Sequence, residues 1–506
     1  MMRILKLTLS LFIGSLIAQA QDVSFSDYTK VNDRYDLFII GGDEDGVFTG
    51  IGDDYYYNGL NNKQVISYYD FDQGQQQSIV VKPEKKSREY FYSFYFQNQL
   101  HLLQYDDKPS EEDGQYHVYL ESYDKSLSRT GEERMVGQLY PYLFTFDVGS
   151  LFRSFFTNQH GKMRRNFFYN HKTSADQQKL ALLFNYNFFG QANAEFQALV
   201  IDENLEEMWS AQIDLPNASE SYRILEDYAL ANDGTLYLLV ANYDNKNFKK
   251  SAIGYEYQLY AYDPAKTAVE EIDFATNGKF IINLGLQLNQ DGKPVLAGVY
   301  ADATTNDIVG GVRIQGSTCD EFAFEEAEVK EINTKQDKNY AEEYTVKNIV
   351  LEDDGSVAFF AESYKRGPIV KPKLGLGGLS PIDANVELGD IYRKVLAVRM
   401  SPDNNHWLKI VDKTQRSSEE RDVLTSFAFT HDEQGYYLLF NNRISNSSDV
   451  SLVKISPSGD ISLDTFFDRS SYRFRAVPAF AASIQPGLLT LPVEKNNKQA
   501  LAIISF

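Results

Sequence analysis

The sequence predicts an all-β fold in which a unit of four antiparallel strands repeats about eight times along the 506 residues. Two recurring patterns support this prediction. One is a tight hairpin, in which a glycine next to a polar residue separates two alternating apolar runs; the other is a strand, a polar turn and a further strand. No Ser/Pro-rich linker or block of charge divides the chain, so regular repetition accounts for its length better than several unrelated domains.

The clearest copy of both patterns lies between Asn232 and Pro264, where NDGTLYLLVANYD is followed by YEYQLYAYDP. Asp-Gly and Asn-Gly dipeptides suit the left-handed backbone conformations of two-residue hairpins. Six hairpins carry the glycine and two weaker ones lack it. They lie at residues 43–51, 232–240, 290–299, 352–363, 432–440 and 485–493, and at 97–105 and 175–186.

The strand, turn and strand pattern occurs in seven full copies, at residues 64–81, 116–136, 196–213, 257–274, 310–329, 395–411 and 451–467. An eighth copy at 498–506 stops after its first strand, whereas a spare alternating strand precedes the first hairpin at 22–28. Pairing these two strands closes a ring of blades, and this is how β-propellers protect their sheet edges. We therefore predict a β-propeller of four-stranded antiparallel blades. Eight blades are preferred, with seven as the alternative because the first two units are the most irregular, and no amphipathic helix is expected to break the pattern.

Two long insertions interrupt the repeats, at about 140–172 and 365–390. Loops of this length inside a compact fold are uncommon and are either functional or mobile. The first insertion is cationic and aromatic within an acidic chain, which fits capture of an anionic group and contact with a sugar or a protein. The competing interpretation is that NFFYN is the first strand of the third unit and that the cations balance local acids. The candidate partner-binding residues are Arg153, Lys162, Arg164, Arg165, Phe167 and Phe168.

Residues 1–20 have the pattern of a cleavable export signal. A short basic start precedes an apolar run at 7–18, and small residues precede Gln21. We expect cleavage near Ala20–Gln21 and a single propeller domain over 21–506, located in the periplasm, outside the cell or at the cell surface. No later stretch approaches the ~20 apolar residues of a membrane helix, so no transmembrane segment is predicted.

The chain is strongly acidic, with a formal net charge of −22. Removal of the signal deletes two basic residues and no acidic ones, which leaves −24. Because nucleic-acid affinity comes largely from Lys and Arg, neither DNA, RNA nor an anionic membrane is an expected partner. Cys319 is the single cysteine, which excludes an intrachain disulfide, and no Cys/His pairing marks it as a nucleophile. Stability must come from buried area, to which 34 Phe and 34 Tyr contribute.

The sequence contains no recognisable catalytic, phosphate-binding or dinucleotide-binding motif, so no catalytic residue, cofactor or metal ligand is assigned. Acidic clusters at 43–46 and 352–355 offer oxygen ligands to Ca²⁺, but both lack the twelve-residue loop pattern, and hairpin turns account for them. Trp209 and Trp407 occupy corresponding places in two units, which predicts packing between blades. The histidines are scattered without metal-ligand spacing; they are His101, His117, His160, His171, His406 and His431.

Several segments resemble a group of exported, propeller-like Bacteroidetes proteins without assigned activity. The resemblance rests on FQALVIDENLEEMWSAQIDLP with YALANDGTLYLLVANYD, and on GDIYRKVLAVRMSPDNNHWLKIVDKTQ with FAFTHDEQGYYLLFNN. It covers about residues 170–506 and departs from the group's pattern at Asn404-Asn405, where Asp-Gly is usual. Since these are strand and turn motifs, the resemblance implies a fold and an exported origin, and no reaction.

Three functions remain open from the sequence. The first is a non-enzymatic exported propeller that presents its loops to a protein or glycan partner. The second is a hydrolase or lyase acting on carbohydrate or peptide, with carboxylates in the central channel. The third is a structural component of an envelope assembly. Converging acids or a histidine cluster in the channel would favour the enzyme.

Overall fold

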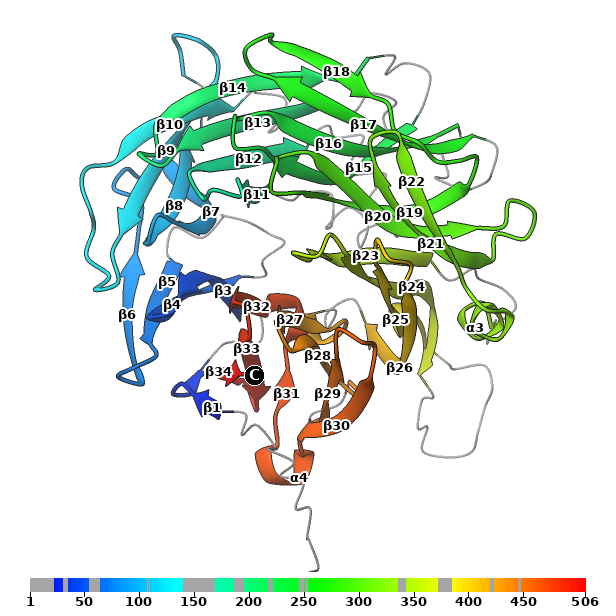
Figure 1. The fold of residues 1–506 in the computed structure, drawn as a ribbon. Helices are drawn as coiled ribbons and strands as arrows, with labels where there is room; N and C mark the ends of the chain where they lie inside the picture. The colour runs from blue at the N-terminus through cyan, green and yellow to red at the C-terminus, as the bar shows by residue number, and fades with distance from the viewer. Residues whose placement is uncertain are drawn as a thin grey trace, which may run out of the picture.

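The computed structural model shows eight antiparallel sheets that follow one another around a ring (Figure 1). In seven sheets, four strands are joined in sequence order, and the eighth combines both ends of the chain. The protein is therefore an eight-bladed β-propeller, as the sequence predicted. The structure describes residues 22–30, 35–53, 64–106, 108, 110–139, 169–185, 195–216, 222–244, 250, 254–334, 343–371, 385–418, 423–444 and 447–506.

The blades are numbered in chain order, and their strands run from the centre of the ring outward. Blade 1 contains β3 (Tyr35–Asp43), β4 (Gly46–Asp53), β5 (Gln64–Asp70) and β6 (Gln75–Val81). Blade 2 contains β7 (Arg88–Phe96), β8 (Gln99–Asp106), β9 (Tyr116–Tyr123) and β10 (Arg134–Leu139). Blade 3 contains β11 (Tyr169–Thr173), β12 (Lys179–Asn185), β13 (Glu195–Asp202) and β14 (Glu207–Asp214). Blade 4 contains β15 (Tyr222–Leu230), β16 (Leu236–Tyr243), β17 (Tyr255–Asp263) and β18 (Ala268–Ile272).

The second half of the ring follows the same order. Blade 5 contains β19 (Phe280–Leu288), β20 (Pro294–Ala301), β21 (Ile308–Gln315) and β22 (Thr318–Ala323). Blade 6 contains β23 (Glu343–Leu351), β24 (Val357–Lys371), β25 (Asn385–Met400) and β26 (Trp407–Ser418). Blade 7 contains β27 (Ala428–Asp432), β28 (Gly435–Asn441), β29 (Val450–Ile455) and β30 (Ile461–Phe467). Blade 8 contains β31 (Arg475–Ala476), β32 (Ala482–Gln485), β33 (Leu488–Lys495) and β34 (Lys498–Ser505), followed by β1 (Asp22–Phe25) and β2 (Thr29–Lys30).

All eight predicted hairpins are present. In blades 1 to 7 the hairpin joins the first two strands, and in blade 8 it joins β32 to β33, which also pairs with β31. The Asp-Gly turns differ in detail from two-residue hairpins. In blade 4 only Gly234 is left-handed, with φ +89°, and the carboxylate of Asp233 accepts a hydrogen bond from the N–H two residues ahead. Gly355 (φ +82°) and Asp354 repeat this arrangement in blade 6. The Asp therefore caps the turn while the Gly supplies its single left-handed residue.

The N-terminal strand closes the ring. Strand β1 pairs antiparallel with β34, from Asp22 opposite Ser505 to Phe25 opposite Ala502, and Phe25 packs into the core shared by blades 7 and 8. Beyond β1, the Ser26 N–H donates to the Leu501 carbonyl at 3.0 Å. The spare strand predicted at the start of the chain thus completes the unit that lacks a strand at its end, which leaves no gap in the ring of sheets.

Alternating side chains of each middle strand fill the two cores on either side of its blade. In β16, Leu238 and Val240 pack into the core shared with blade 3, whereas Leu239 and Ala241 pack into the core shared with blade 5. Both faces are apolar because propeller blades are covered on both sides. The hydrophobic effect of these shared cores therefore holds neighbouring blades together without any disulfide.

The two tryptophans pack between blades as predicted. Each lies near the start of the outer strand of its blade and donates its indole N–H to a backbone carbonyl in a turn of the next blade. Trp209 reaches Gly234 at 3.2 Å, and Trp407 reaches Pro457 at 3.1 Å. Gly234 lies in the first hairpin turn of blade 4 and Pro457 in the turn between the third and fourth strands of blade 7, so corresponding tryptophans reach different turns of the neighbouring blade.

The structure corrects two expectations. A short helix, α3 (Glu326–Ile332), follows blade 5, where only strands were predicted; its first turn is capped because the Glu328 carboxylate accepts from the Glu325 N–H. The insertion at 365–390 is in part a continuation of β24 and β25, paired up to Lys371 opposite Asn385. Two further helical turns, α4 (Arg469–Tyr472) and η3 (Pro478–Phe480), precede the last hairpin. In the described part of the chain, no helix is long and apolar enough to cross a membrane.

Candidate functional site

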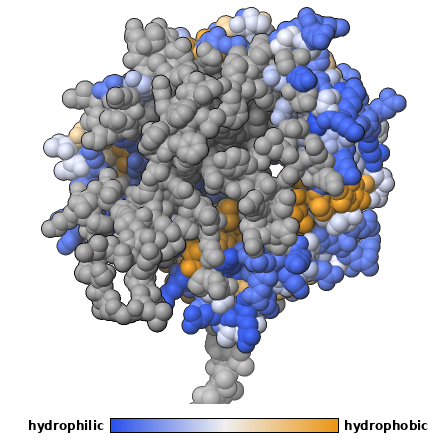
Figure 2. Space-filling view, turned by 180° about the vertical axis from the view of Figure 1, so that it is seen from behind, coloured by the Kyte–Doolittle hydropathy of each residue, from blue (hydrophilic) through white to orange (hydrophobic). Residues whose placement is uncertain are grey.

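The propeller has two unlike faces. On one face lie the first-to-second and third-to-fourth strand connections of each blade, which we call the tight-turn face. On the other lie the second-to-third connections and the links between blades, which we call the variable face; an antiparallel meander places these two sets at opposite ends of its strands. Figure 2 shows that the described surface on the side it presents is mostly hydrophilic, with small hydrophobic areas.

The longest connections lie on the variable face, although the two faces overlap in length: residues 124–133 form a long connection on the tight-turn face, and residues 496–497 form a short turn on the variable face. On the tight-turn face, hairpins are as short as residues 97–98 and 433–434. On the variable face, links between blades run from residues 82–87 to residues 140–168, and another contains α3. The paired extension of β24 and β25 also leaves this face. Since the sheets form a regular ring, the specific features of this protein are concentrated on the variable face.

The candidate partner-binding residues Arg153, Lys162, Arg164, Arg165, Phe167 and Phe168 all lie outside the described residues. The described strands place the two ends of their segment, at Leu139 and Tyr169, on the variable face. Within NFFYN, strand β11 begins at Tyr169, so part of this motif belongs to the first strand of the third unit, as the competing interpretation held.

Polar side chains of the inner strands bridge neighbouring blades. His171 in β11 accepts or donates a hydrogen bond through Nδ1 to the Tyr92 hydroxyl at 2.7 Å, and burial lowers its pKa to about 4. Beside it, Lys172 forms a 3.2 Å ion pair with Asp227, whose other oxygen accepts the Leu286 N–H at 3.1 Å. Asp227 therefore joins blades 3, 4 and 5, and its lone pairs are used for this purpose.

The histidines do not come together. His101 is fully buried between Ser122 Oγ and the Phe96 carbonyl, and burial lowers its pKa to about 4. His117 pairs with Asp113 at 2.9 Å, and His406 accepts the Ser401 N–H. Among the described residues, no three His, Cys, Asp or Glu side chains are grouped as metal ligands; His160 lies outside those residues.

A buried ion pair lies between blades 6 and 7, below the extension of β24 and β25. Glu362 and Lys413 are in direct contact, and neither side chain is exposed. Lys413 also donates to Gln415 Oε1 at 2.8 Å, and Ser426 Oγ donates to Glu362 at 2.6 Å. Burial lowers the pKa of Lys413 despite the neighbouring carboxylate. Both charged side chains belong to blade 6 and neither is exposed, so we assign the pair a structural role.

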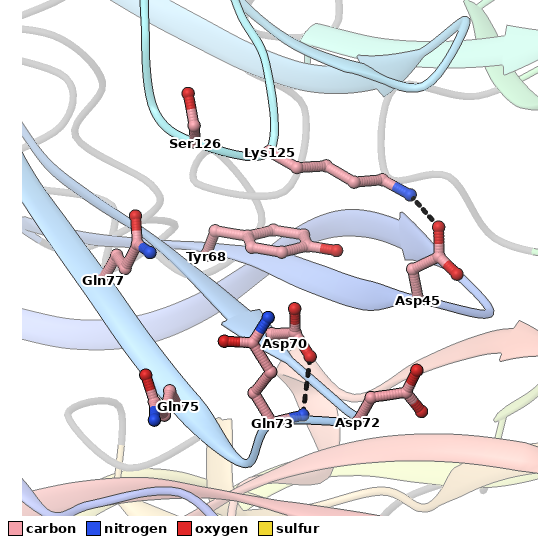
Figure 3. A pocket seen from close by; sticks show the side chains of 9 residues that line it. All are labelled: Asp45, Tyr68, Asp70, Asp72, Gln73, Gln75, Gln77, Lys125 and Ser126. Carbon is pink, nitrogen blue, oxygen red and sulfur yellow. Dashed lines mark hydrogen bonds and ion pairs between the residues drawn. The ribbon is translucent and has the colours of Figure 1, made fainter.

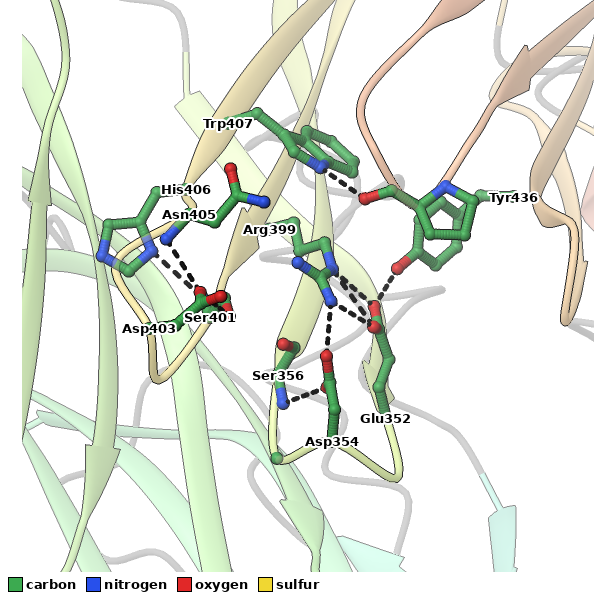
Figure 4. A network of polar contacts seen from close by, with 12 residues as sticks. Glu352, Asp354, Ser356, Arg399, Ser401, Asp403, Asn405, His406, Trp407 and Tyr436 are labelled. Atoms are coloured by element: carbon green, nitrogen blue, oxygen red, sulfur yellow. Dashed lines mark hydrogen bonds and ion pairs between the residues drawn. The ribbon is translucent and has the colours of Figure 1, made fainter.

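On the tight-turn face, an arginine closes the junction between blades 6 and 7 (Figure 4). Arg399 in β25 donates to both oxygens of Glu352 and to Asp354 at 2.8 Å, and only 8 % of its side chain is exposed. Tyr436 of blade 7 donates its hydroxyl to Glu352 in turn. The acidic cluster at 352–355, which the sequence predicted to form a hairpin turn with Ca²⁺ as the alternative, thus holds a guanidinium in this structure.

The equivalent junction between blades 1 and 2 contains a pocket of about 410 Å³ (Figure 3). Lys125 of blade 2 reaches across it to Asp43 and Asp45, so the other acidic turn cluster, 43–46, holds an ammonium group. Burial acts to raise the pKa of Asp43, but hydrogen bonds from Lys125 and Tyr95 outweigh it and lower that pKa. The lining residues are Asp45, Tyr68, Asp70, Asp72, Gln73, Gln75, Gln77, Lys125 and Ser126.

No protein-family model matches the chain, and no curated protein matches its sequence. Among solved structures, the chain is similar to a prolyl endopeptidase, with a TM-score of 0.40 and 8% identity over 92% of this chain and 55% of that one. It is also similar to the β-propeller domain of the Trilobed protease from Pyrococcus furiosus (TM-score 0.33, 10% identity, 88% of this chain and 96% of that one). A polysaccharide lyase of family PL25, an ulvan lyase, gives a TM-score of 0.36 and 9% identity over 88% and 95%. The chain spans little more than half the length of the prolyl endopeptidase, and these low scores carry no argument about function.

Proposed function

We propose that this protein is an exported propeller scaffold that binds a macromolecular partner, protein or glycan, through its variable face. The observation that carries this proposal is the contrast between the two faces. The tight-turn face carries mainly short turns, with residues 124–133 as its longest described connection, whereas the ends of both long insertions, the α3 link and the β24–β25 extension lie on the variable face. Binding residues are disproportionately found on loops held by a rigid scaffold, and this face is where the loops differ from blade to blade.

The cationic and aromatic segment at 140–168 is the part of the variable face to which we assign recognition. Its arginines supply planar, permanently charged donors for an acidic group, and its phenylalanines supply apolar contact area. The chain as a whole is acidic, whereas this segment carries a cluster of positive charges. An anionic group on the partner would therefore be attracted to this segment. Arg164 and Arg165 are the residues that we expect to contribute most.

Site-directed cross-linking tests which face binds. In a Cys319→Ser background, a single cysteine is placed at Thr304 on the variable face or at Ser317 on the tight-turn face; both residues are exposed and belong to connections of blade 5. Each variant is labelled with a photoreactive maleimide and exposed to envelope extract from the native cell. We expect a cross-linked partner from position 304 and none from position 317.

A second comparison tests the assigned residues. The Arg164→Ala/Arg165→Ala double variant should lower the yield of the cross-link from position 304 by about tenfold, if the two charges together contribute on the order of 1.4 kcal/mol. Equal yields from positions 304 and 317 would contradict the assignment of the face. An unchanged yield in the double variant would remove the assignment of these two arginines and leave that of the face.

A further inference from the structure

At the junction of blades 1 and 2, Tyr68 stands where blades 5 and 6 have an arginine. Tyr68 and Arg399 both lie on the third strand of a blade, two residues before the polar side chain that begins the turn to the outer strand, Asp70 or Ser401. In blade 6 the arginine fills this junction with hydrogen bonds. In blade 5, Arg313 occupies the same place and reaches the Gly355 carbonyl of blade 6 at 2.7 Å. Blade 1 has no such arginine, and the space stays open.

The Tyr68 hydroxyl is left without a partner at this open junction. Only 5% of Tyr68 is exposed, and among the described residues its hydroxyl makes no hydrogen bond. The side chain lies between the Lys125–Asp45 ion pair and the Asp70–Gln73 turn, and lines the pocket (Figure 3). Gly46 makes room for it, because a Cβ at that position would come within 2.4 Å of the hydroxyl oxygen. Buried hydroxyls usually have a partner. Tyr228, Tyr257 and Ser356 also have buried hydroxyls without one among the described residues, but of these four residues it is Tyr68 that lines this pocket, and a ligand there could supply the missing partner.

The Tyr68 hydroxyl is protonated at physiological pH and can donate a hydrogen bond. Burial raises the pKa of its hydroxyl to about 12, with smaller effects from the charges of Lys125 and the nearby aspartates. The hydroxyl is therefore neutral at physiological pH and available as a hydrogen-bond donor. The complementary group on a ligand is an acceptor such as a hydroxyl or ring oxygen.

The rest of the lining consists of amides and carboxylates. The pairing of β5 with β6 sets Gln77 opposite Tyr68 and Gln75 opposite Asp70. Among the described residues, neither glutamine side chain has a hydrogen-bond partner, and both are exposed. A primary amide offers two donors and one acceptor oxygen, and a carboxylate offers acceptors only. Together they suit a ligand whose groups both donate and accept, which is the property of hydroxyls.

The charge of the pocket selects against anions. Asp45, Asp70 and Asp72 face a single cation, Lys125, which is already paired with Asp43 and Asp45. An anionic ligand would meet an excess of negative charge with no free cation to offset it. The volume of about 410 Å³ lies within the range of roughly 300–1,000 Å³ that small-molecule sites occupy.

From these observations we infer that the junction of blades 1 and 2 on the tight-turn face binds an uncharged polyhydroxyl ligand, a neutral saccharide. Tyr68 donates to a ligand oxygen, Gln75 and Gln77 bind neighbouring hydroxyls, and the Asp70 carboxylate accepts from a further hydroxyl. This site lies on the opposite face from the proposed partner-binding surface and is independent of it.

The test combines a glycan array with titration calorimetry on the whole purified chain. The array carries neutral oligosaccharides and uronic-acid oligosaccharides, and the neutral glycan with the strongest signal is then titrated in solution. We expect neutral glycans to bind and uronic-acid glycans to be rejected. Tyr68→Phe and Gln77→Ala should each weaken the neutral glycan about threefold to tenfold, the range for loss of one neutral hydrogen bond.

Matched controls separate this site from other effects. Tyr228→Phe removes a second buried hydroxyl that has no partner among the described residues but does not line the pocket, and should leave the affinity unchanged. Titration with CaCl₂ tests whether the carboxylates hold a cation instead. Failure of every neutral glycan to bind would overturn the inference. So would unchanged affinity in Tyr68→Phe and Gln77→Ala, stronger binding of uronic-acid glycans, or saturable Ca²⁺ binding that Asp70→Asn abolishes.

Discussion

The junction of blades 6 and 7 and the junction of blades 1 and 2 are built on the same plan and end differently. In the first, Arg399 spans Glu352 and Asp354 while Tyr436 binds Glu352 from the next blade. In the second, Tyr68 stands in the place of the arginine and its hydroxyl has no partner among the described residues. A tyrosine in place of an arginine thus distinguishes the open junction, which can take a ligand, from the closed structural junction.

The difference shows how a repeat protein gains specificity without changing its fold. Tyr68 and Arg399 both lie on a third strand that pairs antiparallel with the second strand of its blade, and both blades contribute apolar side chains to buried cores. What changes is whether the polar groups of the turn are satisfied within the protein. Where they are, the junction contributes to stability; where they are not, they are available to bind.

The largest expected effect concerns the buried Glu362–Lys413 pair, which is separate from the Arg399 contacts. Lys413→Met leaves Glu362 as an uncompensated buried charge and should destabilise the protein by about 3–5 kcal/mol, measured from the urea unfolding midpoint. The double variant Lys413→Met/Glu362→Leu removes both charges and should recover most of that loss. An equal loss of unfolding free energy in the single and double variants would show that packing around these two residues, and not the charge pair, stabilises the protein.

A smaller loss is expected from Arg399→Met. The change removes hydrogen bonds to two carboxylates while keeping the apolar stem, and hydrogen bonds to charged groups contribute about 1.5–3 kcal/mol each. Because Glu352 keeps the Tyr436 hydroxyl and Asp354 is partly exposed, we expect a net loss of about 2 kcal/mol in chemical unfolding. A loss below about 0.5 kcal/mol would mean that the arginine does not close the junction.

Two tyrosine-to-phenylalanine changes compare the junctions most closely. Tyr436→Phe removes a donor to Glu352 and should cost about 1 kcal/mol. Tyr68→Phe removes a buried hydroxyl that has no protein partner, so the free energy of unfolding should stay within about 0.5 kcal/mol or rise. Thermal unfolding of the two variants, run side by side, distinguishes them. A clear loss in Tyr68→Phe would show that its hydroxyl is already satisfied within the protein.

The smallest effect is a pH dependence of the open junction. Asp43 has a folded pKa below its ordinary value of 3.8, because the hydrogen bonds from Lys125 and Tyr95 outweigh burial. Its carboxylate therefore adds stability above about pH 4, and that stability is lost as the pH falls below 3.8 through the folded pKa. The side chain is partly exposed, so the contribution is less than about 1 kcal/mol. Between pH 5 and pH 3, the free energy of unfolding of Asp43→Asn should therefore fall by less than that of the unmodified protein, and the difference should equal this contribution. An equal fall in both proteins would exclude Asp43 as a source of the pH dependence.

The fold could be predicted from the sequence because its signals are local. Apolar alternation and Asp-Gly turns identify the hairpins, and the spare strand at 22–28 identifies the partner of β34. The helix α3 was missed because EEAEVKEI is only two turns long and its apolar positions also fit a strand. The extension of β24 and β25 was missed because the Gly and Pro residues of its sequence favour a loop.

The pocket could not be predicted in this way. Its lining comes from three stretches, around Asp45, between Tyr68 and Gln77, and at Lys125, which only the stacking of blades brings together. One signal was present in the sequence: an alignment of the third strands places Tyr68 against Arg313 and Arg399. The meaning of that exchange depends on the turn of the next blade, and pairing within one blade does not show it.

The binding of a neutral glycan to a Tyr68→Arg variant tests the central claim most directly. This change gives blade 1 the side chain that closes the junction in blades 5 and 6, with Asp45 and Asp70 as its available partners. The account predicts that the calorimetric signal of the best neutral glycan disappears while the unfolding midpoint stays the same or rises. Unchanged glycan affinity in a folded Tyr68→Arg variant would contradict it.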